Sequence, residues 1–243
     1  MIIDQQLALG AFHPVFCEDF CVHYNLGDDW TVLAVMDGCS GGKDSHFAAA
    51  LLGKIIHKIS RQAPYWELQN PALKLTKVPI EILGRHFIKA VFKEFCQVKQ
   101  QLFLEPEELA STCLLGLYHQ KNKEVWINAS GDGVIVINEE VHLLDQEDKP
   151  NYMTYHHLLT VEEWLEEQTF SLYKKEVSYL ALSTDGVLSF EETTTTIDSL
   201  QYLLGVPTQK ENWVSLQKKC LILERDYQLY PNDDLGIVCL WNP

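Results

Sequence analysis

The chain has 243 residues, of which 47% are hydrophobic and 22% charged, proportions that exclude a disordered or fibrous protein. It carries 19 Lys and Arg against 34 Asp and Glu, and the resulting net charge of −15 argues against nucleic-acid binding and against association with an anionic membrane surface. No apolar run approaches the ~18–20 residues of a membrane-spanning helix. We therefore expect neither a nucleic-acid nor a membrane partner.

The start of the chain and its cysteines favour a reducing compartment. Residues 1–6 show neither the basic region nor the apolar region with which a signal peptide begins. The seven cysteines are odd in number and scattered, and none forms a Cys-x-x-Cys pair. We expect a cytoplasmic protein in which most thiols are buried as small hydrophobic side chains.

The first half of the chain contains one clear strand pattern and two long helix patterns. Residues Thr31–Met36 form a short apolar run rich in β-forming residues, which is typical of a buried strand. Apolar residues then recur at helical spacing from Ser45 to Ile59 and again from Ile80 to Leu102. The proline-containing stretch Arg61–Pro79 interrupts the two helices without marking a domain boundary, so we expect a single domain over residues 1–243.

The second half is dominated by strand patterns. Four of them follow one another with tight connections and predict an antiparallel meander: Ser111–His119, Glu124–Ala129, Val134–Ile137 and Val141–Leu144. Two further strands and a late helix are predicted at Val177–Leu182, Leu235–Trp241 and Trp213–Tyr227. Long helices after the first strands and strands in the middle predict an α+β fold, with antiparallel sheet and segregated helices.

Acidic residues stand at the ends of several of these strands. They occur in the pairs Glu18-Asp19 (before a further predicted strand), Asp37-Gly38, Asp132-Gly133, Asp185-Gly186 and Asp233-Asp234. Carboxylates that converge from neighbouring strands repel one another and favour a hard divalent cation, which takes oxygen ligands. Each Asp-Gly pair is also typical of a hairpin turn, and this alternative is strongest at Asp132, which has strands closely on both sides.

Three other kinds of site match the sequence less well. A thiol phosphatase needs an Arg six positions after its cysteine, but Ser45 holds that position after Cys39. A phosphate-binding P-loop needs Ser or Thr after its lysine, but Asp44 follows Lys43. For zinc, one loosely spaced group of ligands is present: Cys17, Cys21 and His23.

Six motifs, in this order, resemble those of the PP2C-type, metal-dependent protein serine/threonine phosphatases. They are Cys17-Glu18-Asp19, VLAVMDGCSGG, Ser111-Thr112 before CLLGLYH, INASGDGVIVI, LALSTDGVL and NDDLGIVCL. The resemblance covers nearly the whole chain and depends on the order of the motifs, because no single one is specific. It implies two packed antiparallel sheets flanked by pairs of helices, an α-β-β-α sandwich.

The resemblance also implies a metal site and an activity. Two Mg²⁺ or Mn²⁺ ions would lie at one end of the sandwich and activate a bridging water that attacks phosphoserine or phosphothreonine in a protein substrate. Catalysis would depend on Asp37, which bridges both ions, and on Asp185 and Asp233. The full set of implied ligands is Asp19, Asp37, the carbonyl of Gly38, Asp185 and Asp233, with Glu18 beside them and Asp132 tied to a third, weaker ion.

The chain departs from the family pattern at several positions. Cys39 stands where family members often carry a His that can protonate the leaving alkoxide, and Ser189 and Gly133 replace an Asp and a Ser. The family's phosphate-gripping Arg upstream of the Glu-Asp motif is missing, because the first arginine of the chain is Arg61. The candidate substitutes for it are His13, Lys43 and His46.

These departures leave two functions open. The first is a phosphatase acting on phosphoserine or phosphothreonine in proteins, favoured by the retained Asp37, Asp185 and Asp233. The alternative is a catalytically weak or inactive pseudophosphatase that serves as a binding or regulatory module, favoured by the missing Arg and His. The segment Lys149–Glu176 matches no motif, and we expect any substrate selectivity to lie there.

Overall fold

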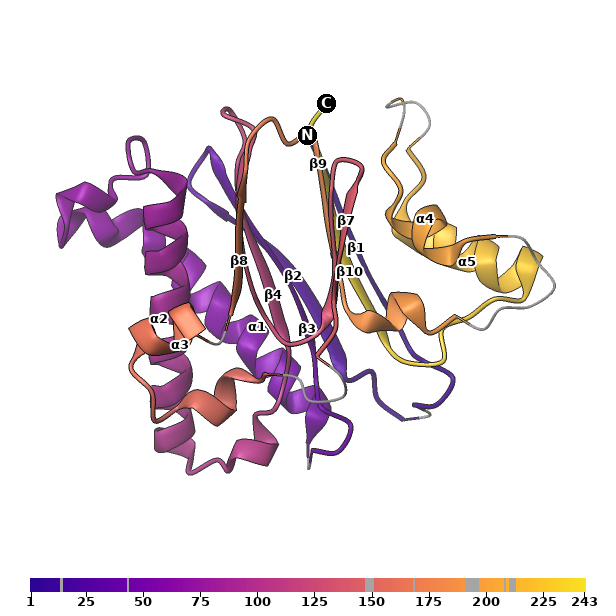
Figure 1. Cartoon of the computed structure of the whole chain (residues 1–243), viewed down its shortest axis with the longest axis horizontal. Helices are drawn as coiled ribbons and strands as arrows, with labels where there is room; N and C mark the ends of the chain where they lie inside the picture. The colour runs from indigo at the N-terminus through magenta and orange to yellow at the C-terminus, as the bar shows by residue number, and fades with distance from the viewer. Residues whose placement is uncertain are drawn as a thin grey trace.

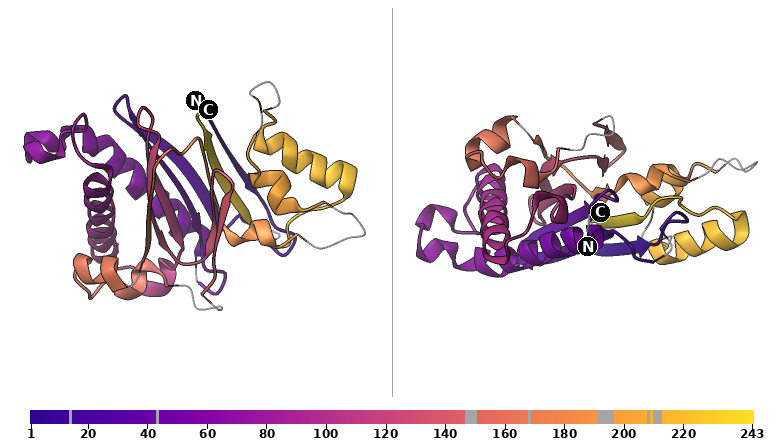
Figure 2. Two further views of the ribbon diagram at one scale, coloured as in Figure 1. Left: turned by 45° about the horizontal axis from the view of Figure 1, so that its top comes forward. Right: turned by 90° about the horizontal axis from the view of Figure 1, so that it is seen from below.

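Two five-stranded antiparallel sheets pack face to face, and helices cover both outer sides (Figure 1). The computed structural model describes residues 1–13, 15–42, 44–146, 151–167, 169–190, 197–207, 209 and 213–243. The two helical layers remain on opposite sides of the sandwich when the molecule is turned (Figure 2). This architecture confirms the predicted α+β fold with flanking helices.

Each sheet combines strands from distant parts of the chain. One sheet has the order β2 (Asp19–Leu26), β3 (Trp30–Asp37), β4 (Cys113–His119), β5 (Glu124–Ser130) and β8 (Phe170–Lys174). The other has the order β1 (Ile2–Ala8), β10 (Leu235–Trp241), β9 (Tyr179–Ser183), β6 (Gly133–Ile137) and β7 (Glu140–Leu144). The two strands without a sequence prediction, β1 and β8, lie at sheet edges, where partial exposure weakens the apolar pattern.

The helices divide between the two outer faces. Helices α1 (Ser45–Gln62) and α2 (Ile80–Leu102) cover the sheet that contains β3, and α3 (Val161–Glu167) packs on α2. Helices α4 (Ser199–Leu204) and α5 (Leu216–Tyr227) cover the other sheet. No helix in the described ranges is long and apolar enough to cross a membrane.

Strand β3 is buried on both faces, which explains its unbroken apolar sequence. Val32, Ala34 and Met36 point toward the helices α1 and α2, in one hydrophobic cluster. Leu33 and Val35 alternate with them and pack in the cluster between the two sheets. The strand is therefore fixed from both sides, and its last residue, Asp37, is held at a defined place at the end of the sandwich.

The predicted meander is wrong at its centre. Strand β5 pairs with β4 and β8, whereas β6 pairs with β7 and β9, so the chain changes sheets between Ser130 and Gly133. Asp132 therefore lies in a corner between the two sheets and not in a hairpin turn. Strand patterns separated by a short connection predict pairing, but they contain no signal that tells a hairpin from a change of sheet.

Two glycines allow the backbone to turn through this corner. Gly131 and Gly133 have φ angles of 96° and 147°, in the region that side chains disfavour. A Cβ at Gly133 would lie 2.8 Å from the carbonyl oxygen of Ser183, and one at Gly131 would lie 2.7 Å from a methyl carbon of Thr112. This explains why glycine stands at position 133, where the family pattern has Ser.

All seven cysteines carry free thiols. Cys21, Cys113 and Cys239 are buried, and the other four are half-buried. The sequence predicted that most thiols are buried, but fewer than half of them are. Burial raises the pKa of Cys17 and of Cys21 to about 12, so both are protonated at neutral pH.

Candidate active site

Asp19 and Asp37 face each other across two adjacent strands. Asp19 is the first residue of β2 and Asp37 is the last of β3, and the two are partners in the antiparallel register. The site lies where β3 ends and α1 begins, at the lower end of the sandwich in Figure 1. The two side chains are close enough for the charge of Asp19, which is 4% exposed, to help raise the pKa of Asp37.

The loop after Asp37 is held by the residues that precede β4. The backbone N–H of Asp37 donates to Oγ1 of Thr112 over 2.9 Å, and the N–H of Thr112 donates to the Asp37 carbonyl over 2.8 Å. The N–H of Gly38 donates to the carbonyl of Glu18 over 3.1 Å. The Ser-Thr motif of the sequence thus has a structural role, because it fixes the backbone that carries Asp37.

Thr184 connects Asp19 to the opposite sheet. Its hydroxyl donates to Oδ2 of Asp19 over 2.6 Å and accepts the N–H of Gly236 over 2.9 Å. Its own N–H donates to the Gly236 carbonyl over 3.0 Å. Sequence reasoning missed this residue, although it directly precedes the Asp185-Gly186 motif.

Asp185 and Asp233 reach the same place from the other sheet. Asp185 follows β9, and Asp233 precedes β10, where its N–H donates to Oγ of Ser189 over 3.0 Å. The negative charges of Asp19, Asp185 and Asp233 all act on Asp37. The structure therefore brings together the four acidic side chains that the sequence singled out at the ends of β2, β3, β9 and β10.

Burial and mutual repulsion raise the pKa of three of these groups. Burial, together with the charges of Asp234 and Asp185, raises the pKa of Asp19 to about 8. Burial and the charges of Asp19, Asp185 and Asp233 raise the pKa of Asp37 well above its usual range. Burial and the charge of Asp233 also raise the pKa of Asp185. Such a cluster of carboxylates is stabilised by any added positive charge.

Asp234 ties the N-terminal loop to the start of β10. It is 2% exposed, and its carboxylate accepts the N–H groups of Gly10 over 2.7 Å and of Glu18 over 2.5 Å. Its Oδ2 also accepts from Nδ1 of His13 over 2.8 Å. The sequence offered Asp233 and Asp234 as one pair, but only the structure separates the half-exposed Asp233 from this buried, fully bonded neighbour.

His13, a candidate phosphate-binding residue, faces the acidic cluster. Its Nδ1 contacts Asp234, and its Nε2 lies 3.6 Å from Oδ1 of Asp233. Burial lowers the pKa of His13, but the hydrogen bond to Asp234 and the charges of Asp234, Asp233 and Glu18 outweigh burial and raise it above 6.5. The neighbouring carboxylates therefore favour the protonated form of the imidazole.

The remaining candidates lie around this cluster. Glu18 accepts a hydrogen bond from the hydroxyl of Ser45, while its buried Oε2 accepts none. His46 is exposed and stacks on Phe16, with ring centroids 4.6 Å apart. Lys43 lies outside the described residues. Asp132 lies in the corner beside Thr112 and Ser183.

Cys39, which replaces the family's His, lies near a tyrosine. Tyr152 is 6% exposed, and its hydroxyl is close enough to the thiol of Cys39 and to Asp37 to be affected by both. Burial, Cys39 and the charge of Asp37 raise the pKa of Tyr152. Tyr152 belongs to the segment that sequence reasoning could not interpret, so no motif signalled its position.

The donor chemistry of the cluster fits Mg²⁺ or Mn²⁺, because both prefer carboxylate and carbonyl oxygens. In the described part of the chain, however, no group of three or more His, Cys, Asp or Glu side chains is arranged so that it could hold a metal ion. The charges of Asp19, Asp185 and Asp233 all act on Asp37, and a bound cation would offset this repulsion.

The three loosely spaced candidate ligands for zinc make contacts with other protein groups. The thiols of Cys17 and Cys21 donate to the carbonyls of Ala8 and Gln6, at 3.8 and 3.6 Å. Nδ1 of His23 lies 2.9 Å from Oε1 of Gln5. These contacts attach β2 to β1 and its end.

The fold resembles solved phosphatase structures over nearly its whole length. The S. agalactiae serine/threonine phosphatase has a TM-score of 0.63 at 14% identity, with 100% of this chain and 99% of that chain covered. Serine/threonine phosphatase Stp1 from Staphylococcus aureus has a TM-score of 0.60 at 14% identity, with 98% and 94% covered. A C. elegans sex determining protein has a TM-score of 0.62 at 15% identity, with 100% and 65% covered.

These low identities show a shared fold, and the sequence itself shows the family. No curated protein sequence matches the chain. The family model described as protein phosphatase 2C matches residues 14–219, which include Asp19, Asp37 and Asp185. The match extends over most of the chain and includes both long helices and eight of the ten strands, β2 to β9. The chain belongs to the protein phosphatase 2C family.

Proposed function

We propose that this chain is a metal-dependent phosphatase that removes phosphate from phosphoserine and phosphothreonine in proteins. The observation that carries the proposal is the gathering of Asp19, Asp37, Asp185 and Asp233 at one end of the sandwich, where burial and the charges of their neighbours raise the pKa of the first three. A folded protein gains nothing from such repulsion by itself. The arrangement is accounted for if the site takes up positive charge during its function.

In this proposal two Mg²⁺ or Mn²⁺ ions are held by five groups: the carboxylates of Asp19, Asp37, Asp185 and Asp233 and the carbonyl of Gly38. Asp37, on which the charges of Asp19, Asp185 and Asp233 all act, would be the residue that serves both ions, as the family resemblance implies. Glu18 supports the site from beside it, and Asp132 is assigned to a weaker third ion. When bound, the ions supply positive charge that attracts the phosphate dianion and lowers the pKa of water.

The surrounding residues keep this site in shape. Thr184 orients the carboxylate of Asp19 by its hydrogen bond, and Thr112 fixes the backbone of Asp37. Asp234 holds the loop that carries His13 and Glu18. Nε2 of His13 lies 3.6 Å from Oδ1 of Asp233, and in the protonated imidazole it would donate to a phosphate oxygen that approaches the cluster.

The alternative is a binding or regulatory protein without turnover. Three observations favour it: Cys39 replaces the family's His, all three arginines are exposed on α1, α2 and α5, and no three or more described His, Cys, Asp or Glu side chains are arranged together to hold an ion. A phosphoprotein partner suits either function. The two functions differ in whether metal addition produces turnover.

The test is hydrolysis of 4-nitrophenyl phosphate and of a phosphoserine peptide with Mn²⁺, with Mg²⁺, or with EDTA. We expect metal-dependent turnover that falls at least ~100-fold in Asp37→Asn and Asp185→Asn. Asp226→Asn, an exposed carboxylate on α5, is the matched control and should keep the full rate. Folded protein without metal-dependent turnover would reject the enzyme and favour the regulatory alternative.

A further inference from the structure

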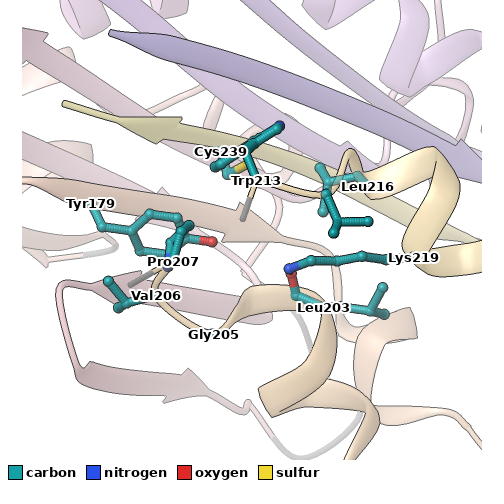
Figure 3. Close-up of a pocket in the computed structure, with 10 residues that line it drawn as sticks. Tyr179, Leu203, Gly205, Val206, Pro207, Trp213, Leu216, Lys219 and Cys239 are labelled. Carbon is teal, nitrogen blue, oxygen red and sulfur yellow. The ribbon is translucent and has the colours of Figure 1, made fainter. Parts of the chain in front are cut away.

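A cavity of about 220 Å³ lies between the helices α4 and α5 and the outer face of their sheet (Figure 3). Tyr179 of β9 and Cys239 of β10 form its floor, and Leu216 and Lys219 of α5 line one wall. None of the acidic residues of the candidate active site lines it. The cavity is therefore a separate feature of the molecule.

Lys219 is the only charged side chain among the residues that line this cavity. Its Nζ donates one hydrogen bond, over 2.9 Å, to the carbonyl of Leu203 near the end of α4. An ammonium group has three N–H donors and a positive charge. A single neutral acceptor satisfies one donor and leaves the charge without a paired anion. Burial accordingly lowers the pKa of Lys219, although the charges of Cys239 and Asp4 oppose the shift.

No described carboxylate pairs with this ammonium group. The ion pairs of lysine within the described residues involve Lys58, Lys74, Lys89, Lys121 and Lys174. The charge of Asp4 reaches Lys219, but Oδ2 of Asp4 accepts the N–H of Leu216 at the start of α5. A half-buried cation without a paired anion is costly, and a bound anion would remove that cost.

The rest of the lining is shaped for an apolar body. Leu203, Val206, Pro207 and Trp213 surround the space, and Trp213 stacks on Trp241 with ring centroids 5.9 Å apart. A dry cavity of ~150 Å³ is enough to hold benzene. A volume of about 220 Å³ therefore accommodates one aromatic ring with a small substituent.

Two polar atoms in the cavity define what that substituent is. Figure 3 shows the hydroxyl of Tyr179, on the floor beside Cys239, and the amine of Lys219, on the wall, pointing toward one another. One ammonium and one hydroxyl match the two oxygens of a carboxylate, whereas a phosphate dianion carries three oxygens and a second charge. We propose that this cavity binds a small aromatic monocarboxylate, whose carboxylate pairs with Lys219 and whose ring packs beside Trp213 and Val206.

The test is titration of the full chain with benzoate, and with neutral benzamide of the same shape, followed by ligand-observed NMR. We expect saturable binding of benzoate, and binding of benzamide that is weaker by at least ~10-fold because it cannot form the ion pair. Lys219→Met keeps most of the side-chain stem and should weaken benzoate by a similar factor. Lys218→Met, exposed on the same helix, should leave binding unchanged.

A second variant tests the role of the cavity volume independently of the charge of Lys219. Val206→Trp fills the space and should abolish binding while Lys219 remains. The proposal is overturned if wild-type protein shows no saturable benzoate binding, if benzamide binds as well as benzoate, or if Val206→Trp binds normally. The benzamide comparison uses wild-type protein alone, so it decides the question even where a variant does not fold. Phosphatase activity enters none of these readouts.

Discussion

Asp19 and Asp37 are register partners at the open end of β2 and β3, and the charge of Asp19 helps to raise the pKa of Asp37. Such a pair of carboxyl groups is stabilised by added positive charge, either a proton or a metal cation. The arrangement links the stability of the protein to pH and to divalent metal, and both links can be measured.

The first prediction concerns pH. Asp19 has a pKa of about 8 in the folded protein against an ordinary value of 3.8, and the pKa values of Asp37 and Asp185 are raised as well. The folded state therefore binds protons more tightly than the unfolded state between these values. The contribution of these groups to the free energy of unfolding is fully present below about pH 4, and it is lost as the pH rises through 8.

Thermal unfolding in EDTA at pH 5 and pH 8 checks this prediction. We expect the higher Tm at pH 5, and a smaller difference in Asp37→Asn, which removes one of the repelling carboxyl groups. A Tm that is equal at both pH values, or higher at pH 8, would show that the acidic groups are not strained by burial and repulsion in the metal-free protein.

The second prediction concerns Thr184, whose hydroxyl serves both Asp19 and the N–H of Gly236. Thr184→Val keeps the shape of the side chain but leaves these two buried groups unsatisfied, so we expect a loss of about 1–3 kcal/mol in the free energy of unfolding. Thr184→Ser keeps the hydroxyl and is the matched control. Urea denaturation curves measure both, and equal stability of the valine and serine variants would remove Thr184 from this role.

The sequence predicted the helices α1 and α2 and the central strands because their apolar patterns are long and regular. It also predicted the convergence of Asp19, Asp37, Asp185 and Asp233, since each follows or precedes a buried strand. It could not predict that β5 and β6 belong to different sheets, because pairing depends on contacts far along the chain. The roles of Thr184, Asp234 and Tyr152 depend on such contacts too.

The third prediction concerns Asp234 and the N-terminal loop. Asp234→Ala removes the acceptor for Gly10, His13 and Glu18 together, so we expect a loss of about 3 kcal/mol. We also expect faster proteolysis between residues 10 and 18. Asp234→Asn, which keeps one carbonyl oxygen as an acceptor, should recover part of the loss. If the alanine variant is as resistant to protease as the wild type, the loop is held by other contacts.

The fourth prediction concerns the corner between the sheets. Gly133→Ser introduces a side chain at a φ of 147° and within 2.8 Å of the Ser183 carbonyl, so we expect a loss of about 1–3 kcal/mol. Gly41→Ala is the control, because a Cβ there meets no atom closer than 3.8 Å. Chemical denaturation measures the free energy of unfolding of both variants. A Gly133→Ser protein as stable as the wild type would mean that the corner adapts to a side chain.

The most direct test of the account is Mn²⁺ binding itself, measured by electron paramagnetic resonance on the full chain at pH 7.5. We predict that wild-type protein and the control Asp226→Asn bind Mn²⁺, and that Asp37→Asn binds it at least ~10-fold more weakly. Binding that is absent from the wild type, or that is equally strong in Asp37→Asn, would contradict the claim that the acidic residues at the end of the sandwich form a divalent-cation site.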